Sequence, residues 1–174
     1  MSLTPDVRRI GAQLKKALYL KEGFSLIEQL NCGWLDGGCW ALASGLKSWI
    51  GDGVDLYCVY DFGGAPQHIV AKVDSEDMFI DGDGLSTRAE LLKKMKEKEF
   101  LDGPATVSEF FPGNLRATGN GIERWDALSR KVAAFLKKEF GPGDHWLGSL
   151  YIALNGAEFG EQDTRLSSGD DFTL

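Results

Sequence analysis

Three cysteines and two histidines are the side chains of this sequence that could supply a nucleophile and its base. A cysteine nucleophile needs a neighbouring group that takes and returns a proton, and histidine is the usual one. The cysteines stand at positions 32, 39 and 58 and the histidines at 68 and 145, so three times two gives six pairings. The sequence around each residue has to decide between these pairings.

Cys39 has the most favourable surroundings of the three cysteines. It follows Gly37-Gly38 and opens an amphipathic helical pattern, which places its thiol at a predicted helix N-terminus. Unpaired N–H groups and the helix dipole favour an anion there and lower a thiol's pKa, although a helix-start cysteine can also belong to the core. Cys58 lies inside a strand pattern, where cysteine is usually a small buried apolar residue. Cys32 is the rival nucleophile, but it stands in a loop with no helix directly after it.

His68 is the predicted base, because a carboxylate is expected beside it. It begins one apolar strand pattern, and a second pattern returns along the chain and ends at Asp81. In a hairpin of these two strands, His68 faces residues 81–83. A carboxylate at that place would fix the histidine tautomer and stabilise the imidazolium. Asp81 is the first choice and Asp83 the alternative, while a third interpretation treats the Asp-Gly-Asp-Gly run as turn chemistry only. Phe79 and Asp81 are expected to share one face of their strand, and Asp83 is expected to point to solvent or to cap the helix that follows.

The sequence gives little support to other chemistries. His145 stands in a loop-like Gly-Pro-Gly-Asp-His-Trp segment and is expected to be structural or exposed to solvent. The acids near residues 81–84 do not recur at the spacing of a calcium loop, and no cysteine–histidine cluster has the spacing of a zinc site. We therefore expect neither a metal nor a cofactor.

The segment Gly38-Cys39-Trp40-Ala41-Leu42-Ala43 resembles the nucleophile helix of papain-like cysteine peptidases, and also the Cys-Trp helix of transglutaminase-like proteins. The hairpin from His68 to Asp81 resembles the catalytic hairpin of the transglutaminase-like proteins. Both families use Cys, then His, then Asp or Asn in chain order, as here. The resemblance spans about residues 29–84 and implies a Cys39, His68 and Asp81 triad. It also implies an α+β papain-like fold, in which the nucleophile helix packs on a small antiparallel sheet and further helices follow.

The sequence departs from the papain-like pattern at the oxyanion hole. Papain-like enzymes carry a glutamine shortly before the cysteine, and the amide side chains upstream of Cys39 are Gln29 and Asn31. Either amide, together with the Cys39 backbone N–H, would serve as the oxyanion donors. The separation of Cys39 and His68 is also short, which implies a minimal version of the scaffold.

The chemistry implied by these residues is cleavage of an amide or peptide bond through a thioacyl intermediate. The expected substrate is a peptide, a protein or a small amide. Transfer of the acyl group to an amine is a close variant. A non-catalytic papain-like module that binds a peptide or protein partner is the alternative, and a peptidoglycan endopeptidase is a third hypothesis.

The elements that must position these residues follow from apolar spacing and from turn residues. Helices are predicted over about residues 4–20, 39–50, 87–100 and 123–140, with Thr4 and Thr87 as caps and Ser86 as an alternative to Thr87. Strands are predicted over residues 54–60, 68–73 and 78–81. Residues 101–121 are predicted to be loop, residues 147–154 a last strand or a short helix, and residues 155–174 a loose tail.

The length and charge of the chain limit its partners. Its 174 residues predict one domain, and the net charge of −7 argues against nucleic acid and against an anionic membrane surface. The sequence contains no run of about 18 consecutive apolar residues, so it predicts no membrane-spanning helix. The N-terminal residues lack the pattern of a secretory signal, and the odd number of cysteines suits a reducing cytoplasm.

Overall fold

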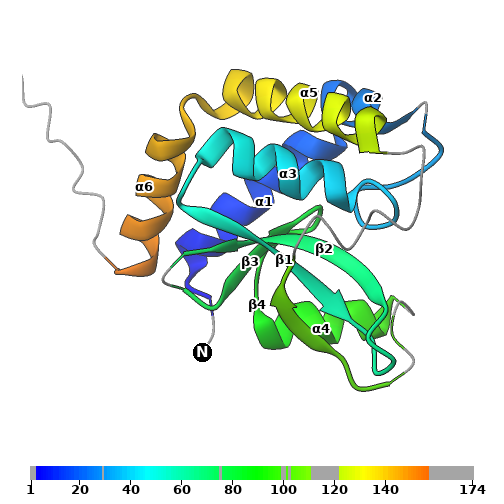
Figure 1. The fold of residues 1–174 in the computed structure, drawn as a ribbon. Coiled ribbons are helices and arrows are strands. Elements are labelled where there is room, and N and C mark those ends of the chain that lie inside the picture. Colours follow the sequence, from blue (N-terminus) through cyan, green and yellow to red (C-terminus); the bar gives the residue numbers. More distant parts are fainter. Residues whose placement is uncertain are drawn as a thin grey trace, which may run out of the picture.

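A five-stranded antiparallel sheet lies at the centre of the computed structural model, with the strand order β4-β3-β2-β1-β5 (Figure 1). The structure describes residues 3–28, 30–74, 76–98, 101, 103–110 and 122–156, without the side chains of residues 122–124. The strands of this part are β1 (Val54–Tyr60), β2 (Pro66–Val73), β3 (Met78–Asp81), β4 (Gly84–Thr87) and β5 (Thr106–Glu109). The predicted α+β class is confirmed.

Helices cover both faces of this sheet (Figure 1). They are α1 (Pro5–Tyr19), α2 (Lys21–Glu28), α3 (Cys39–Ile50), α4 (Arg88–Glu97), α5 (Ile122–Phe140) and α6 (Gly143–Leu154). One face packs on α3 and α1, and α5 lies over α3, while α4 covers the opposite face. The predicted packing of the Cys39 helix on an antiparallel sheet that contains β2 and β3 is confirmed.

Alternation of side chains along β2 and β3 fills both layers of the core. Ala71 and Ile80 point toward the layer that contains α3, whereas Val70 and Phe79 pack with the buried side chains of α4. Because Phe79 and Ile80 face opposite sides, Asp81 returns to the side of α4. This confirms the expectation that Phe79 and Asp81 share a face.

Local capping explains where two of the helices begin. The Thr4 hydroxyl accepts the Val7 N–H at 3.3 Å at the start of α1. At the start of α4, the Glu90 N–H donates to the Thr87 hydroxyl and the Thr87 N–H donates back to the Glu90 carboxylate, at 3.3 and 3.0 Å. Both predicted caps are therefore present, and α4 carries a reciprocal capping box.

Several predicted elements differ from the structure. The helix α2 was not predicted, because its eight residues are too few for a clear period. Strands β4 and β5 lie where turn and loop were predicted, and each has only four residues and pairs at an edge of the sheet. The predicted last strand or short helix is α6, which begins earlier than expected, at Gly143.

Three further predicted boundaries concern the end of α4, the loop after it and the C-terminal tail. The helix α4 ends at Glu97 rather than near Phe100. Residues 111–121 of the predicted loop and residues 157–174 of the predicted tail lie outside the described residues.

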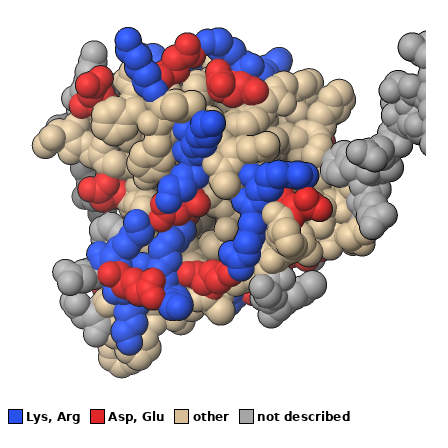
Figure 2. Space-filling view, turned by 180° about the vertical axis from the view of Figure 1, so that it is seen from behind, with Lys and Arg blue, Asp and Glu red and all other residues tan. Residues whose placement is uncertain are grey.

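Charges of both signs alternate over the face that is shown in Figure 2. Arg8 of α1 pairs with Glu90 of α4 at 2.8 Å, and Arg88 pairs with Asp77 at 2.8 Å. Within the described residues, no helix is both long enough and apolar enough to cross a membrane.

Candidate active site

A tight glycine loop sets the start of α3. The Gly33 N–H donates to the Asp36 side chain at 2.8 Å, and the Gly38 N–H donates to the Gly33 carbonyl at 2.9 Å. Gly37 has a φ of 81°, and a Cβ on Gly38 would lie 2.6 Å from the Gly33 oxygen. Larger side chains would therefore disturb the loop. Gly38 is the N-cap and has no side chain to accept a hydrogen bond, so the first-turn N–H groups of α3 are not capped by it.

Cys39, the first residue of α3, is partly exposed. Burial would by itself raise the pKa of its thiol. The neighbouring His68 and hydrogen bonds from the backbone of Ile69 and Trp40 outweigh this effect and lower the pKa below its ordinary value of 9.0. The thiol pKa is therefore shifted in the direction that favours the thiolate, which is the reactive form of cysteine.

His68 lies near the start of β2, and its imidazole is buried against Asp81. Its Nε2 atom is 3.2 Å from Asp81 Oδ2. Ala71 pairs with Ile80 in the β2–β3 ladder, so Asp81 at the end of β3 is a diagonal rather than a direct neighbour of His68. The expected contact between His68 and Asp81 is present.

The second ring nitrogen of His68, Nδ1, has different surroundings from Nε2. Nδ1 is buried and has no hydrogen-bond partner among the residues that the structure describes. The Cys39 sulfur forms no well-aligned hydrogen bond with it, yet lies close enough for the two groups to shift each other's pKa. Catalytic hydrogen bonds are often poorly aligned before substrate binds. Burial would lower the His68 pKa, but Asp81 and Cys39 together raise it to about 9.

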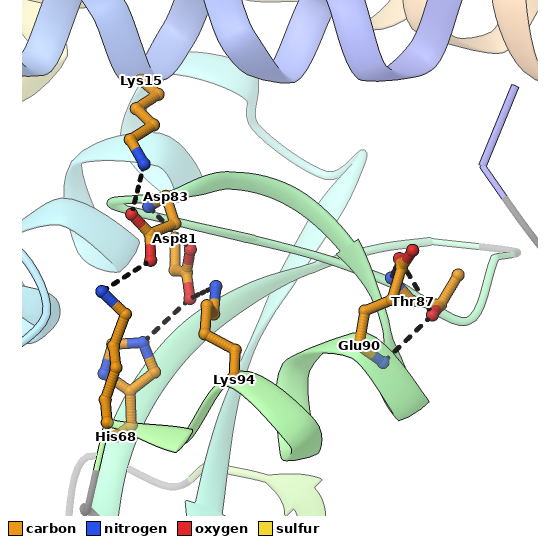
Figure 3. Close-up of polar contacts among 8 residues, drawn as sticks. Lys15, His68, Asp81, Asp83, Thr87, Glu90 and Lys94 are labelled. Atoms are coloured by element: carbon orange, nitrogen blue, oxygen red, sulfur yellow. Dashed lines mark hydrogen bonds and ion pairs between the residues drawn. The ribbon is translucent and has the colours of Figure 1, made fainter. Parts of the chain in front are cut away.

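Three elements hold the Asp81 carboxylate (Figure 3). Oδ2 accepts from His68 of β2 and from Lys94 Nζ of α4, the latter at 2.5 Å. Oδ1 accepts the backbone N–H of Asp83 at 2.9 Å. Burial would raise the pKa of the Asp81 carboxyl, but the His68 hydrogen bond and the Lys94 charge outweigh it and lower that pKa. Asp81 is therefore held as an anion.

Asp83 does not behave as expected. It was expected to point to solvent or to cap the following helix, but its carboxylate pairs with Lys15 of α1 at 2.9 Å (Figure 3). It also pairs with Lys98 at 3.3 Å. Its side chain is only 14% exposed. The reason is tertiary, because α1 crosses β4 beside this turn and brings Lys15 to it. The alternative triad acid is thus occupied by two lysines, and its ion pairs among the described residues do not include His68.

The remaining candidate residues have other places. Cys58 is fully buried, and burial raises its pKa to about 11, so it suits the predicted core role. Cys32 is half-buried and packs against Gly37 of the glycine loop. His145 lies exposed in α6 rather than in a loop.

The two oxyanion candidates remain predictions. Asn31 is exposed and adopts a φ of 51° in the left-handed region. Gln29 lies outside the described residues.

Lys94 is the site residue that the sequence interpretation missed. A lysine on a surface helix is usually solvated, yet residues 91, 94, 95 and 98 fall on one side of α4, and Leu91 and Met95 are buried there. That spacing was the available signal that Lys94 points toward the sheet.

A cavity of about 450 Å³ lies away from these residues. Met78 and Thr87, at the far end of β3 and β4 from Asp81, line it together with Leu3 and Thr4 before α1 and with residues of α4 and α6. Its lining includes none of Cys39, His68 and Asp81, so we do not assign it to the candidate site.

The chain matches no protein-family model, no curated protein and no solved structure. Its chemistry has to be derived from the side chains themselves.

Proposed function

We propose that this protein is a papain-like cysteine hydrolase that cleaves an amide or peptide bond through a thioacyl intermediate. One observation carries the proposal. A buried imidazole has the Asp81 carboxylate on Nε2 and an unpaired Nδ1, and its other ionisable neighbour is the Cys39 thiol. This arrangement suits a nucleophile, a base and an orienting acid.

The reactive form is a Cys39 thiolate beside a His68 imidazolium. The lowered thiol pKa and the raised histidine pKa both favour this form. It predominates above the Cys39 pKa, which lies below 9.0, and is lost as the pH rises through the His68 pKa of about 9. Turnover should therefore fall on the alkaline side near pH 9, as the imidazolium loses the proton that the leaving group needs.

In acylation, the Cys39 sulfur attacks the carbonyl carbon, and a C–S bond forms as the carbonyl π electrons move to oxygen. His68 Nδ1 donates its proton to the amide nitrogen, the C–N bond breaks and an amine leaves. Asp81 stays ionised and orients the imidazole throughout. The oxyanion is stabilised by the Cys39 backbone N–H, with Asn31 or Gln29 as the proposed second donor.

In deacylation, neutral His68 takes a proton from water while the water oxygen attacks the thioester carbon. The C–S bond then breaks, a carboxylic acid is released and the Cys39 thiolate returns beside the imidazolium. An amine in place of water gives acyl transfer by the same steps.

The three cysteines form no disulfide among themselves, which suits the proposed cytoplasmic setting.

Alkylation kinetics test the proposal without a known substrate. We expect iodoacetamide to label Cys39 first, with a midpoint below pH 9.0 in the wild type. His68→Ala should shift that midpoint upward and slow labelling at pH 6 about tenfold for each pH unit of the shift, because each unit changes the thiolate fraction tenfold. His145→Ala is the matched control, since its exposed imidazole lies in α6.

An acyl probe then separates an enzyme from a binding module. Wild-type protein with p-nitrophenyl acetate should form an acetyl-Cys39 thioester that hydrolyses, whereas His68→Ala should fail to turn it over. Equal alkylation profiles in wild type and His68→Ala, or preferred labelling of Cys32, would contradict the proposal and favour the non-catalytic alternative.

A further inference from the structure

Lys94 and His68 approach the same oxygen of Asp81 from two different elements. Lys94 Nζ lies 2.5 Å and His68 Nε2 lies 3.2 Å from Oδ2 (Figure 3). The Asp81 carboxylate is buried, and the Lys94 side chain is only 17% exposed. One carboxylate oxygen thus accepts hydrogen bonds from two cationic groups, in a place where little water screens their charges.

The placement of Lys94 is unusual for a lysine. Its neighbours on the same side of α4, Leu91 and Met95, are fully buried in the core beneath the sheet. An ammonium group at such a position costs free energy unless it is paired, and its described partner is Asp81. Lys93, one residue earlier, is 75% exposed and pairs loosely with Glu97 at 3.7 Å.

We propose that Lys94 is a positioning residue of the candidate active site, which shares the Asp81 carboxylate with His68 and so limits how firmly Asp81 holds the imidazolium proton. The consequence for catalysis rests on the proposed function. A histidine that holds its proton too firmly is a poor general acid for the leaving amine. The ammonium of Lys94 takes part of the carboxylate's charge and repels the imidazolium.

Other ionisable groups lie around this pair on several elements. Cys39 faces His68 from α3, Cys58 of β1 lies against the His68 backbone, and Asp83 faces Asp81 from the β3–β4 turn. Lys15, Lys98 and Tyr19 lie near Asp83. Lys15 and Lys98 pair with Asp83 rather than with Asp81. Among the described residues, Lys94 is therefore the lysine that is placed to tune His68 through Asp81.

The titration of the His68 ring tests this inference directly. The chain has two histidines, so ¹³C-labelled imidazole signals can be assigned from His145→Gln, and the His145 signal serves as an internal control. Lys94→Met keeps the length of the side chain and removes its charge, Lys94→Arg restores a cation, and Lys93→Met is the matched control on the exposed face of α4.

We expect His68 to titrate about one pH unit higher in Lys94→Met than in the wild type, because one neighbouring positive charge is lost in a partly buried site. Lys94→Arg and Lys93→Met should titrate close to the wild type. An unchanged or lower His68 midpoint in Lys94→Met, with circular dichroism showing a folded protein, would overturn the inference. This readout needs no turnover, so failure of the acyl-probe experiment would reject the proposed function and leave the result on Lys94 standing.

Discussion

Asp81 and Asp83 are two residues apart and have entirely different contacts. Asp81 is buried and accepts hydrogen bonds from His68, Lys94 and a backbone N–H. Asp83 is occupied by Lys15 and Lys98, which are 51% and 43% exposed. An orienting carboxylate has to be held firmly before the reaction begins, so Asp81 fits that role and Asp83 does not.

Substitution of each acid by its amide should separate the two. Asp81→Asn removes the charge opposite His68, so we expect a lower His68 pKa, slower Cys39 alkylation at neutral pH and a loss of turnover of up to roughly 10⁴-fold. Asp83→Asn keeps the backbone N–H that binds Asp81 and loses ion pairs to two lysines that stay accessible to solvent, each pair worth about 1 kcal/mol or less. Its alkylation rate should stay within about twofold of the wild type.

The measurements are alkylation kinetics, urea unfolding and turnover of the acyl probe. If Asp83→Asn lost thiol reactivity while Asp81→Asn kept it, Asp83 rather than Asp81 would be the orienting acid. If neither variant changed the reactivity of Cys39, the triad itself would be wrong.

At the scale of elements, α1 and β4 cross in backbone contact. A Cβ on Gly11 would lie 2.8 Å from the Leu85 nitrogen, and a Cβ on Gly84 would lie 2.5 Å from the Gly11 oxygen. Gly84 also has a φ of 100°, which L side chains rarely adopt. This close crossing sets the distance at which Lys15, one turn after Gly11, reaches Asp83 beside Asp81.

Gly84→Ala should therefore destabilise the protein by at least about 1–3 kcal/mol, because it combines backbone strain with a clash against a backbone atom. The matched control is Gly148→Ala in α6, where an added Cβ meets no atom within 4 Å. That substitution should leave the free energy of unfolding unchanged or raise it by up to about 1 kcal/mol. Urea denaturation measures the free energy of unfolding of both variants. Equal stability of the two would show that α1 can move away from β4 at the crossing at little cost in free energy.

At the scale of the whole molecule, Cys58 reports on the integrity of the sheet. It lies in β1 between β2 and β5, opposite Ile69 and Ser108, and it is fully buried under the face that α3 covers. Cys39 is partly exposed at the start of that same helix. The two thiols therefore differ in access although they belong to one packed region.

We expect Cys39 to be alkylated in the native protein and Cys58 only when the sheet opens. The extent of Cys58 labelling should follow the global unfolding curve in urea, as measured by circular dichroism, because central strands open only with the whole fold. Its pKa of about 11 adds to this protection at neutral pH. Labelling of Cys58 well below the unfolding transition would instead show that β5 separates from the sheet as an independent unit.

The local features of this protein could be predicted from its sequence. Caps at Thr4 and Thr87, the helix that begins at Cys39 and the strands that carry His68 and Asp81 follow from hydrogen bonds and side-chain periods within a few residues. The contact of His68 with Asp81 could be predicted as well, because a hairpin makes it a near neighbour in the chain. The catalytic role of these residues stays a prediction.

Tertiary packing alone decided the rest of the site. The two short edge strands have too few residues for a readable pattern, and they form because β3 and β1 offer them unpaired backbone groups. The partners of Asp81 and Asp83 on α1 and α4 depend on where those helices cross the sheet. The burial of one carboxylate and the charge around it depend on elements that are distant in the chain. They therefore cannot be predicted from the residues next to that carboxylate in the sequence.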